Sequence, residues 1–258
     1  MKQQEIALHI RNWLLTYCEN AQMNGFIVGI SGGIDSALTS TLCAMTGKEV
    51  LLVSMPIRQT KKELDRAQHH MKELEKRFEN VRALEIDLTS IFEKFEQTMP
   101  ENTSTDFLSM ANARSRLRMT TLYALGQSNK LLVTGTGNKV EDFGIGFFTK
   151  YGDGGVDISP IADLNKSEVF AVAKELNVIR EILEAKPTDG LWDDERTDED
   201  HIGASYPELE WAMEFKGDEA RLSERETEVL EIYRSYNSVN QHKMVPIPVC
   251  TIPEDLKA

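Results

Sequence analysis

The sequence predicts an α/β fold built on a parallel β-sheet. Short apolar runs typical of strands alternate with longer segments in which apolar residues recur at helical spacing. The first such run, residues 26–30, leads directly into a serine- and glycine-rich turn at 31–36 and then into a helical pattern. This alternation predicts right-handed βαβ units and therefore parallel strands. The 258 residues suffice for one large domain, which we expect to span residues 1–258.

The first half of the chain supplies the expected strands and the helices between them. The strands are expected at 26–30, 50–54, 82–86 and 131–134, and the helices at 5–19, 34–45, 61–79 and, in two parts broken near Pro100, 92–127. His69 and His70 fall in the third helix. Adjacent residues of a helix point in different directions, so we expect exposed surface there and no metal site.

Composition and charge exclude several classes of protein. A net charge of −13 argues against nucleic acid as a partner, because phosphate backbones select basic surfaces. No apolar run approaches the ~20 residues that a membrane span needs. The three cysteines are scattered and form no C-x-x-C pair, so we expect no disulfide framework. We therefore expect a cytoplasmic protein without a membrane or nucleic-acid partner.

The segment Ser-Gly-Gly-Ile-Asp-Ser, residues 31–36, predicts a phosphate-binding loop. Gly32 and Gly33 allow close approach of the backbone, and the free amides at the start of the next helix favour an anion. Asp35 would repel phosphate unless a divalent metal lies between them. The Walker pattern is excluded, because the one Gly-Lys pair, at 47–48, is followed by a glutamate. The alternative is a turn that uses glycine for geometry alone.

Three arginines within five residues, Arg114, Arg116 and Arg118, stand out in a chain this acidic. Arg114 and Arg118 share a helix face by the i, i+4 rule, and Arg116 points elsewhere. A solvated face would explain the cluster, but charge patterning favours anion binding.

Residues 135–155 contain seven glycines, which predicts an irregular loop. The loop presents Lys139, Glu141 and Lys150, and we expect it to wrap a ligand; a merely flexible loop is the alternative. Glu141 and Asp35 follow different strands, so the two carboxylates could share a magnesium ion that also takes phosphate oxygens.

Together these segments resemble the ammonia-dependent NAD synthetases, which are N-type ATP pyrophosphatases. The resemblance is carried by residues 31–36, 112–119, 135–139 and 147–155, and it continues through 156–160, 163–166, 186–188 and 242–243. It covers essentially the whole chain. It implies a three-layer, Rossmann-like parallel sheet with helices on both faces, and a single domain without a glutaminase domain.

The implied activity is ATP-dependent amidation of deamido-NAD with ammonia, which gives NAD, AMP and pyrophosphate through an acyl-adenylate. The resemblance also implies Mg²⁺ as cofactor and a homodimer with substrate sites at its interface. Alternatives are another ATP pyrophosphatase, such as a GMP-synthetase-like amidase or a tRNA thiolase, and a non-catalytic nucleotide sensor of the same fold. The joint presence of Asp35, Glu141 and Lys166 argues against the sensor.

The resemblance also assigns roles to individual residues. ATP is expected at Gly29, Ile30, Ser31, Gly32, Gly33, Ile34, Asp35, Ser36, Arg58, Thr136, Lys166 and Thr188. Deamido-NAD is expected at Arg116, Lys150, Asp157, His242 and Lys243. Asp35 and Glu141 are the expected magnesium ligands, and Asp35, Lys166 and Asp153 the expected catalytic residues. The sequence shows no obvious base that deprotonates ammonium, and Asp153 and Asp157 are candidates by their location only.

The chain departs from the family pattern at two places. The first departure is in the spacing between Gly135 and Gly146. When the family pattern is aligned on Gly135, the second metal ligand falls on Glu141, whereas alignment on Gly146 places it on Asp142. We prefer Glu141. Residues 193–200 contain six acidic side chains, for which a solvated loop is the first interpretation and a lid over the substrate the second.

Overall fold

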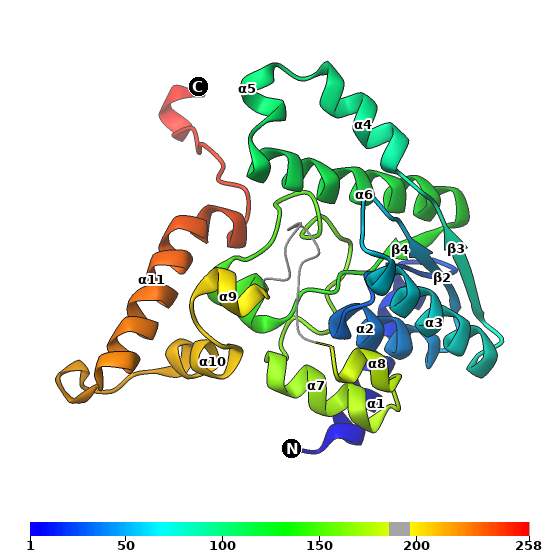
Figure 1. Ribbon diagram of the computed structural model, residues 1–258, viewed down its shortest axis with the longest axis horizontal. Helices are drawn as coiled ribbons and strands as arrows, with labels where there is room; N and C mark the ends of the chain where they lie inside the picture. Colours follow the sequence, from blue (N-terminus) through cyan, green and yellow to red (C-terminus); the bar gives the residue numbers. More distant parts are fainter. Residues whose placement is uncertain (186–196, 258) are drawn as a thin grey trace.

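The computed structural model describes residues 1–185 and 197–257. Its centre is a parallel sheet of four strands in the order β3-β2-β1-β4 (Figure 1). The strands are β1 (Gly25–Gly29), β2 (Glu49–Ser54), β3 (Val81–Glu85) and β4 (Leu131–Val133). Beyond β4, Thr134 forms a parallel bridge with Ile158. The expected sheet is confirmed, and each strand lies within one residue of its predicted bounds.

Helices cover both faces of the sheet, so the predicted three layers are confirmed. One face packs against α1 (Gln3–Asn20), α2 (Ile34–Ala44), α3 (Lys61–Arg77), α7 (Lys166–Glu175) and α8 (Arg180–Leu183). The other packs against α4 (Thr89–Thr98) and α6 (Phe107–Asn129), and the short α5 (Glu101–Ser104) follows the expected break at Pro100. Side chains of β1 alternate between the two cores: Phe26 and Val28 enter the first, Ile27 the second.

A third cluster of apolar side chains holds the C-terminal helices together. It joins α9 (Asp198–Ile202), α10 (Tyr206–Glu214) and α11 (Glu224–Met244) to a π-helical turn at Val140–Ile145. Short 3-10 turns lie at Glu219–Arg221 and Glu254–Leu256. These helices stand beside the sheet layers (Figure 1), and α10 is joined to α7 by hydrogen bonds from Ser167 to Glu210. Among the described residues, none of the helices combines the length and the apolar character of a membrane span.

The prediction that both histidines of α3 are exposed is wrong for His70. Its ring is 2% exposed and shares a hydrogen bond of 2.9 Å between Nε2 and Oγ of Ser40 on α2. Burial lowers the pKa of His70 to about 4, and the charges of Arg77 and His69 act in the same direction. His70 is therefore a neutral core residue at the α2–α3 contact.

This burial predicts a loss of stability in mild acid. The unfolded chain protonates His70 below its ordinary pKa of about 6.5, but the folded chain does so only near pH 4. Between these values the unfolded state gains protons, so the free energy of unfolding falls by up to roughly 3 kcal/mol as the pH drops. Urea unfolding of the wild type and of His70→Gln at pH 7 and pH 5 measures this contribution. An equal pH dependence in the two proteins would contradict it.

Candidate active site

A cavity of about 520 Å³ opens at the carboxyl ends of β1 and β4. Its walls are the 31–36 loop after β1, the 134–137 segment after β4, and side chains from α3, α6 and α11. Ligands of open parallel sheets bind at this edge, as expected from the sequence. The phosphate loop and the glycine-rich loop thus belong to one site.

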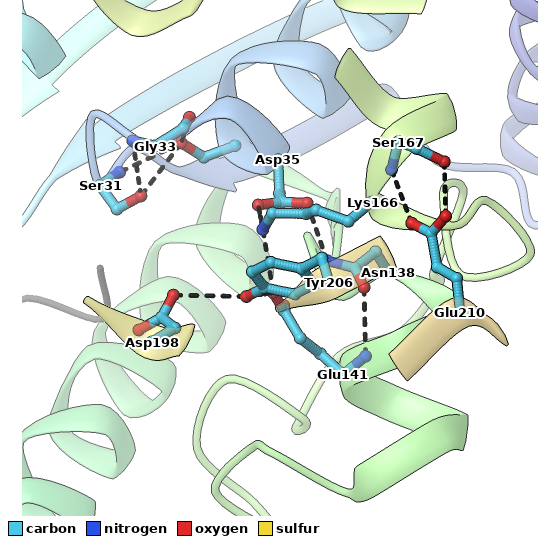
Figure 2. A network of polar contacts seen from close by, with 11 residues as sticks. Ser31, Gly33, Asp35, Asn138, Glu141, Lys166, Ser167, Asp198, Tyr206 and Glu210 are labelled. Atoms are coloured by element: carbon cyan, nitrogen blue, oxygen red, sulfur yellow. Dashed lines mark hydrogen bonds and ion pairs between the residues drawn. The ribbon is translucent and has the colours of Figure 1, made fainter. Parts of the chain in front are cut away.

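The 31–36 loop is fixed by its own hydrogen bonds. The Gly33 amide donates to Oγ of Ser31 at 3.2 Å, and Oγ of Ser36 donates to the Gly33 carbonyl at 3.0 Å (Figure 2). Gly32 has φ of +86°, and a Cβ there would lie 2.8 Å from the carbonyl oxygen of Glu63 on α3. Only glycine suits that position. The helix α2 begins at Ile34, so its first amides face the cavity that an anion would enter.

Lys166 lies between two carboxylates that are far apart in sequence. Its Nζ donates to Oδ2 of Asp35 at 2.6 Å and to Oε1 of Glu141 at 2.9 Å (Figure 2). Asn138 connects the same pair, because its Nδ2 donates to Oδ1 of Asp35 at 3.0 Å and its Oδ1 accepts from the Glu141 amide at 3.1 Å. The Lys166 side chain is 4% exposed and each carboxylate 17%. The structure thus brings together the three residues on which the sequence argument depended most.

The triad Asp35–Lys166–Glu141 carries a net charge of −1 when all three groups are ionised. Burial raises the pKa of Asp35, and Lys166 opposes that rise. Burial acts in the same direction on Glu141, but the Lys166 charge and the hydrogen bond from Tyr206 outweigh it and lower the pKa of Glu141. Burial alone would lower the pKa of Lys166, yet the charges of Asp35 and Glu141 raise it. The lysine is therefore cationic, and one more positive charge would neutralise the net charge of the triad.

Tyr206, at the start of α10, is a site residue that the sequence analysis missed. Its hydroxyl donates to Oε1 of Glu141 at 2.6 Å, and Nζ of Lys166 lies 4.8 Å from its ring centroid. Ser167 supports this arrangement, because its amide and hydroxyl donate to Glu210 of α10 at 2.9 and 2.7 Å (Figure 2). No sequence signal marks the hydroxyl, because the contact joins parts of the chain 65 residues apart.

We expect Tyr206→Phe to slow AMP formation about 10- to 100-fold, because Glu141 loses a charge-assisted hydrogen bond in a buried site. The variant should stay folded, since the ring and its packing are unchanged. Tyr233→Phe is the matched control: Tyr233 belongs to the same apolar cluster, and its hydroxyl has no hydrogen bond to a described residue. AMP release at saturating ATP measures the effect. Equal rates for both variants would contradict a role for the Tyr206 hydroxyl.

The cavity wall contains most of the residues expected to contact ATP. These are Gly29, Ile30, Ser31, Gly32, Gly33, Ile34, Asp35, Ser36, Thr136 and Lys166, and they are joined there by Glu141, Asp153 and Lys243. Thr188 lies outside the described residues. Arg58 lies outside the cavity lining and pairs with α4, where its Nη2 is 2.8 Å from Glu96 and 3.6 Å from Glu93. Its contact with ATP stays a prediction.

Four residues expected to hold deamido-NAD lie outside the cavity lining. Arg116, Lys150 and His242 form an exposed chain of contacts, in which Nε of Arg116 donates to the Lys150 carbonyl at 3.3 Å and Nζ of Lys150 to the His242 carbonyl at 2.7 Å. The carboxylate of Asp157 instead accepts from the hydroxyl of Tyr123 at 3.0 Å and from the Val133 amide at 2.8 Å. Asp157 thus fastens β4 to α6, and its substrate contact also stays a prediction.

Asp142 lines the cavity but does not join the triad. Its carboxylate lies against Gly137, where an added Cβ would overlap it. Burial and the charges of Glu141, Asp153 and Asp35 raise the pKa of Asp142 to about 8. Of the two residues selected by counting, Glu141 is the one that faces Asp35.

The arginine segment divides between the cavity and the surface as the helix periodicity predicts. Arg118 lines the cavity, and its Nε donates to the Met55 carbonyl at 3.0 Å. Burial, together with the charge of Arg114, lowers the pKa of Arg118 to about 10. Arg114 is buried near the rings of Phe92 and Phe107, whereas Arg116 is exposed.

The acidic stretch at 193–200 is only partly described, because residues 193–196 lie outside the described part. Asp198, however, is 8% exposed in the cavity wall, with Oδ2 at 3.4 Å from the Tyr206 hydroxyl. The interpretation of this stretch as a solvated loop is therefore wrong for Asp198.

The fold is an α/β parallel sheet whose 31–36 loop lies beside a buried lysine–carboxylate triad in the wall of one cavity. Residues 6–246 match the family model of NAD synthase. The chain is 38% identical over 246 residues to an NH(3)-dependent NAD(+) synthetase of Alkaliphilus oremlandii, covering 92% of this chain and 93% of the relative. It is 35% identical to the corresponding protein of Mycoplasma genitalium, covering 86% and 87%. The chain belongs to the NAD synthase family, as predicted.

Solved structures agree with this assignment. An NMN synthetase from Francisella tularensis superposes with a TM-score of 0.87 at 31% identity, covering 98% of this chain and all of that one. An NH3-dependent NAD synthetase from Campylobacter jejuni gives 0.78 at 28% identity, covering 97% and 100%. Each match extends over the sheet, the cavity and the C-terminal helices together.

Proposed function

We propose that this protein catalyses the ATP-dependent amidation of deamido-NAD with ammonia, which yields NAD, AMP and pyrophosphate. The observation that carries the proposal is the Asp35–Lys166–Glu141 triad beside the 31–36 loop in the wall of one cavity. The named activity of the relatives supports the choice of substrate. The cavity is large enough for a nucleotide, since ligand sites typically measure about 300–1,000 Å³.

The proposed reaction has two steps. A carboxylate is a poor electrophile, so one oxygen of the nicotinate carboxylate first attacks the α-phosphorus of ATP and displaces pyrophosphate. Ammonia then attacks the carbonyl carbon of the acyl-adenylate; the bond from that carbon to the bridging oxygen breaks, AMP leaves, and a proton is lost from nitrogen. The chain contributes the loop amides, which orient the phosphates, and Lys166, whose cationic Nζ faces the negative charge that develops.

The triad fits a magnesium ion, which we propose as the cofactor. Asp35 and Glu141 offer hard oxygen donors that lie close together around Nζ of Lys166, and their charge exceeds that of Lys166 by one unit. Among the described residues no cluster of three or more acidic, His or Cys side chains could hold a metal. The remaining ligands would therefore be phosphate oxygens and water. When bound, the ion would neutralise charge on the phosphate oxygens.

We propose Asp153 as the acceptor of the ammonium proton. It lines the cavity, and its Oδ1 accepts hydrogen bonds from the hydroxyl of Ser115 at 2.7 Å and from the Thr149 amide at 3.0 Å. These bonds fix the carboxylate and leave Oδ2 without a partner among the described residues.

We propose a homodimer from the family resemblance, and a cytoplasmic location from the cysteine pattern and the lack of a long apolar run. The position of Arg116, Lys150 and His242 supports the dimer. They lie outside the cavity of a single chain, where a second subunit could complete a site for the longer substrate.

A second candidate substrate is nicotinate mononucleotide, whose amidation would give NMN. The observation in its favour is the superposition on a protein described as an NMN synthetase, at a higher TM-score and identity than on the Campylobacter NAD synthetase. The two substrates share the nicotinate carboxylate and the same two chemical steps. They differ in the adenylate half, for which we propose Arg116, Lys150 and His242 as the binding residues.

One assay tests the proposal. The protein is incubated with ATP, Mg²⁺ and ammonium chloride, and with either deamido-NAD or nicotinate mononucleotide; parallel reactions contain glutamine in place of ammonium. We expect NAD in step with AMP and pyrophosphate, no product with glutamine, and a kcat/KM at least about tenfold higher for deamido-NAD than for the mononucleotide, equivalent to roughly 1.4 kcal/mol. Higher efficiency with the mononucleotide would favour NMN synthesis. ADP in place of AMP would contradict adenylation.

A further inference from the structure

Arg66, on α3, is a cavity residue to which neither the sequence motifs nor the family resemblance assigned a role. It lines the cavity together with Glu63, one turn earlier on the same helix. Helix α3 contacts the phosphate loop directly at this point. A Cβ on Gly32 would lie 3.2 Å from the Ala67 amide nitrogen and 3.4 Å from Cβ of Arg66. The guanidinium group therefore extends from the wall that supports the loop.

The guanidinium group of Arg66 has no partner within the described protein. Its Nε is buried and makes no hydrogen bond, and Arg66 forms no ion pair with any described residue. The Glu63 carboxylate forms no ion pair with Arg66; it accepts at 2.9 Å from the hydroxyl of Thr60, where it caps the helix. A buried donor on a permanently charged group is costly unless a ligand pairs with it.

The other cations of the cavity wall already have partners. Among the described residues that line the cavity, the remaining arginine and lysines are Arg118, Lys166 and Lys243. Nε of Arg118 donates to the Met55 carbonyl, Lys166 lies between its two carboxylates, and Nζ of Lys243 donates to the Phe148 carbonyl at 2.8 Å. Among these described cations, Arg66 is thus the one whose buried Nε has no partner in the protein.

We propose that Arg66 binds the β- and γ-phosphates of ATP and holds the pyrophosphate that leaves. The proposal deepens the proposed function and rests on it. The proposal follows from the contacts on two sides of the 31–36 loop. Helix α3 contacts the loop at Gly32. Lys166 and Glu141 lie at Asp35, on the side of the 135–155 loop. Lys150 and Asp153, which we propose for the carboxylate substrate and the ammonium proton, also belong to the 135–155 loop. Because the leaving pyrophosphate departs opposite the attacking oxygen, we place the phosphates beyond the α-phosphorus toward Arg66. The planar guanidinium suits two phosphate oxygens at once.

Arg77, at the end of α3, provides the matched control. Its side chain is exposed, donates to the carbonyls of Leu176 and Asn177, and lies outside the cavity lining. Arg66→Gln and Arg77→Gln therefore remove the same charge from two positions of one helix, and only the first of them lines the cavity. Arg66→Lys keeps the charge but loses the planar fork.

Calorimetric titration with inorganic pyrophosphate, ATP and AMP, each in the presence of Mg²⁺, tests the proposal on the full chain. We expect Arg66→Gln to weaken binding of pyrophosphate and ATP about 10- to 100-fold, with AMP unchanged, because only the first two carry the phosphates in question. Arg66→Lys should recover part of the loss, and Arg77→Gln should bind all three ligands like the wild type. Circular dichroism of each variant reports its folding.

Three outcomes would overturn the proposal. The first is equal pyrophosphate affinity in the wild type and in folded Arg66→Gln. The second is that Arg66→Gln weakens the binding of AMP as much as that of ATP. The third is that the wild type binds neither pyrophosphate nor ATP. Failure of the proposed function has a different signature, namely a wild type that binds ATP and pyrophosphate but forms neither NAD nor NMN.

Discussion

Asp35→Asn is expected to lower the rate of pyrophosphate formation on the order of 10³-fold or more, because the substitution removes several kcal/mol of charge stabilisation at the phosphates. Asparagine keeps the size of the side chain and its hydrogen bond from Asn138, so the loop and α2 should retain their structure. The substitution removes the negative charge of Asp35, which pairs with Nζ of Lys166 and would bind the metal. Pyrophosphate release with ATP, Mg²⁺ and deamido-NAD measures the effect.

Asp163→Asn is the control for this substitution. Asp163 forms an ion pair with Lys139 at 3.2 Å, but its side chain is 98% exposed and lies outside the cavity lining. We expect that variant to retain the wild-type rate. If folded Asp35→Asn formed NAD at the normal rate, the assignment of Asp35 to the metal and to catalysis would be wrong.

Lys166→Met is expected to abolish turnover and also to destabilise the fold. Removing the lysine leaves two carboxylates facing each other in a buried site, and breaking a buried ion pair in this way costs about 3–5 kcal/mol. Methionine preserves the length of the side chain, so lost packing contributes little. Lys174→Met on the exposed side of the same helix should change the free energy of unfolding by less than about 0.5 kcal/mol.

A double variant separates charge from structure at this site. Lys166→Met combined with Glu141→Gln removes one carboxylate charge with the lysine, so it should regain a large part of the lost stability while staying inactive. Urea unfolding and NAD formation are the two measurements. A single Lys166→Met variant as stable as the wild type would contradict the account of a tightly coupled triad.

The sheet and half of the site were predictable because they are encoded locally. Each strand is a short apolar run, and alternate side chains of β1 enter opposite cores, as a sheet covered on both faces requires. The pairing of Asp35 with Glu141 followed from topology, because the carboxyl ends of adjacent parallel strands meet at one edge. Lys166 came from the family resemblance, and the structure places its amine between them.

The rest of the site depends on contacts that no local pattern records. Tyr206 reaches Glu141 only because α10 packs on the π-helical turn, and the apolar spacing of α10 does not reveal which hydroxyl faces inward. His70 and Arg66 lie on α3, where helical spacing identifies a buried face but not which polar residue shares it. Arg58, just after β2, pairs with two glutamates on α4, which no local pattern indicated, and its contact with ATP stays a prediction.

The central claim, adenylation of a nicotinate carboxylate, is tested most directly by following one oxygen atom. Deamido-NAD labelled with ¹⁸O in its carboxylate is converted with ATP and ammonium, and the products are analysed by mass spectrometry. If the carboxylate attacks the α-phosphorus, the bridging oxygen leaves with AMP, so AMP gains one ¹⁸O and the amide of NAD keeps the other. Unlabelled AMP, or ¹⁸O in inorganic phosphate or pyrophosphate, would contradict the mechanism.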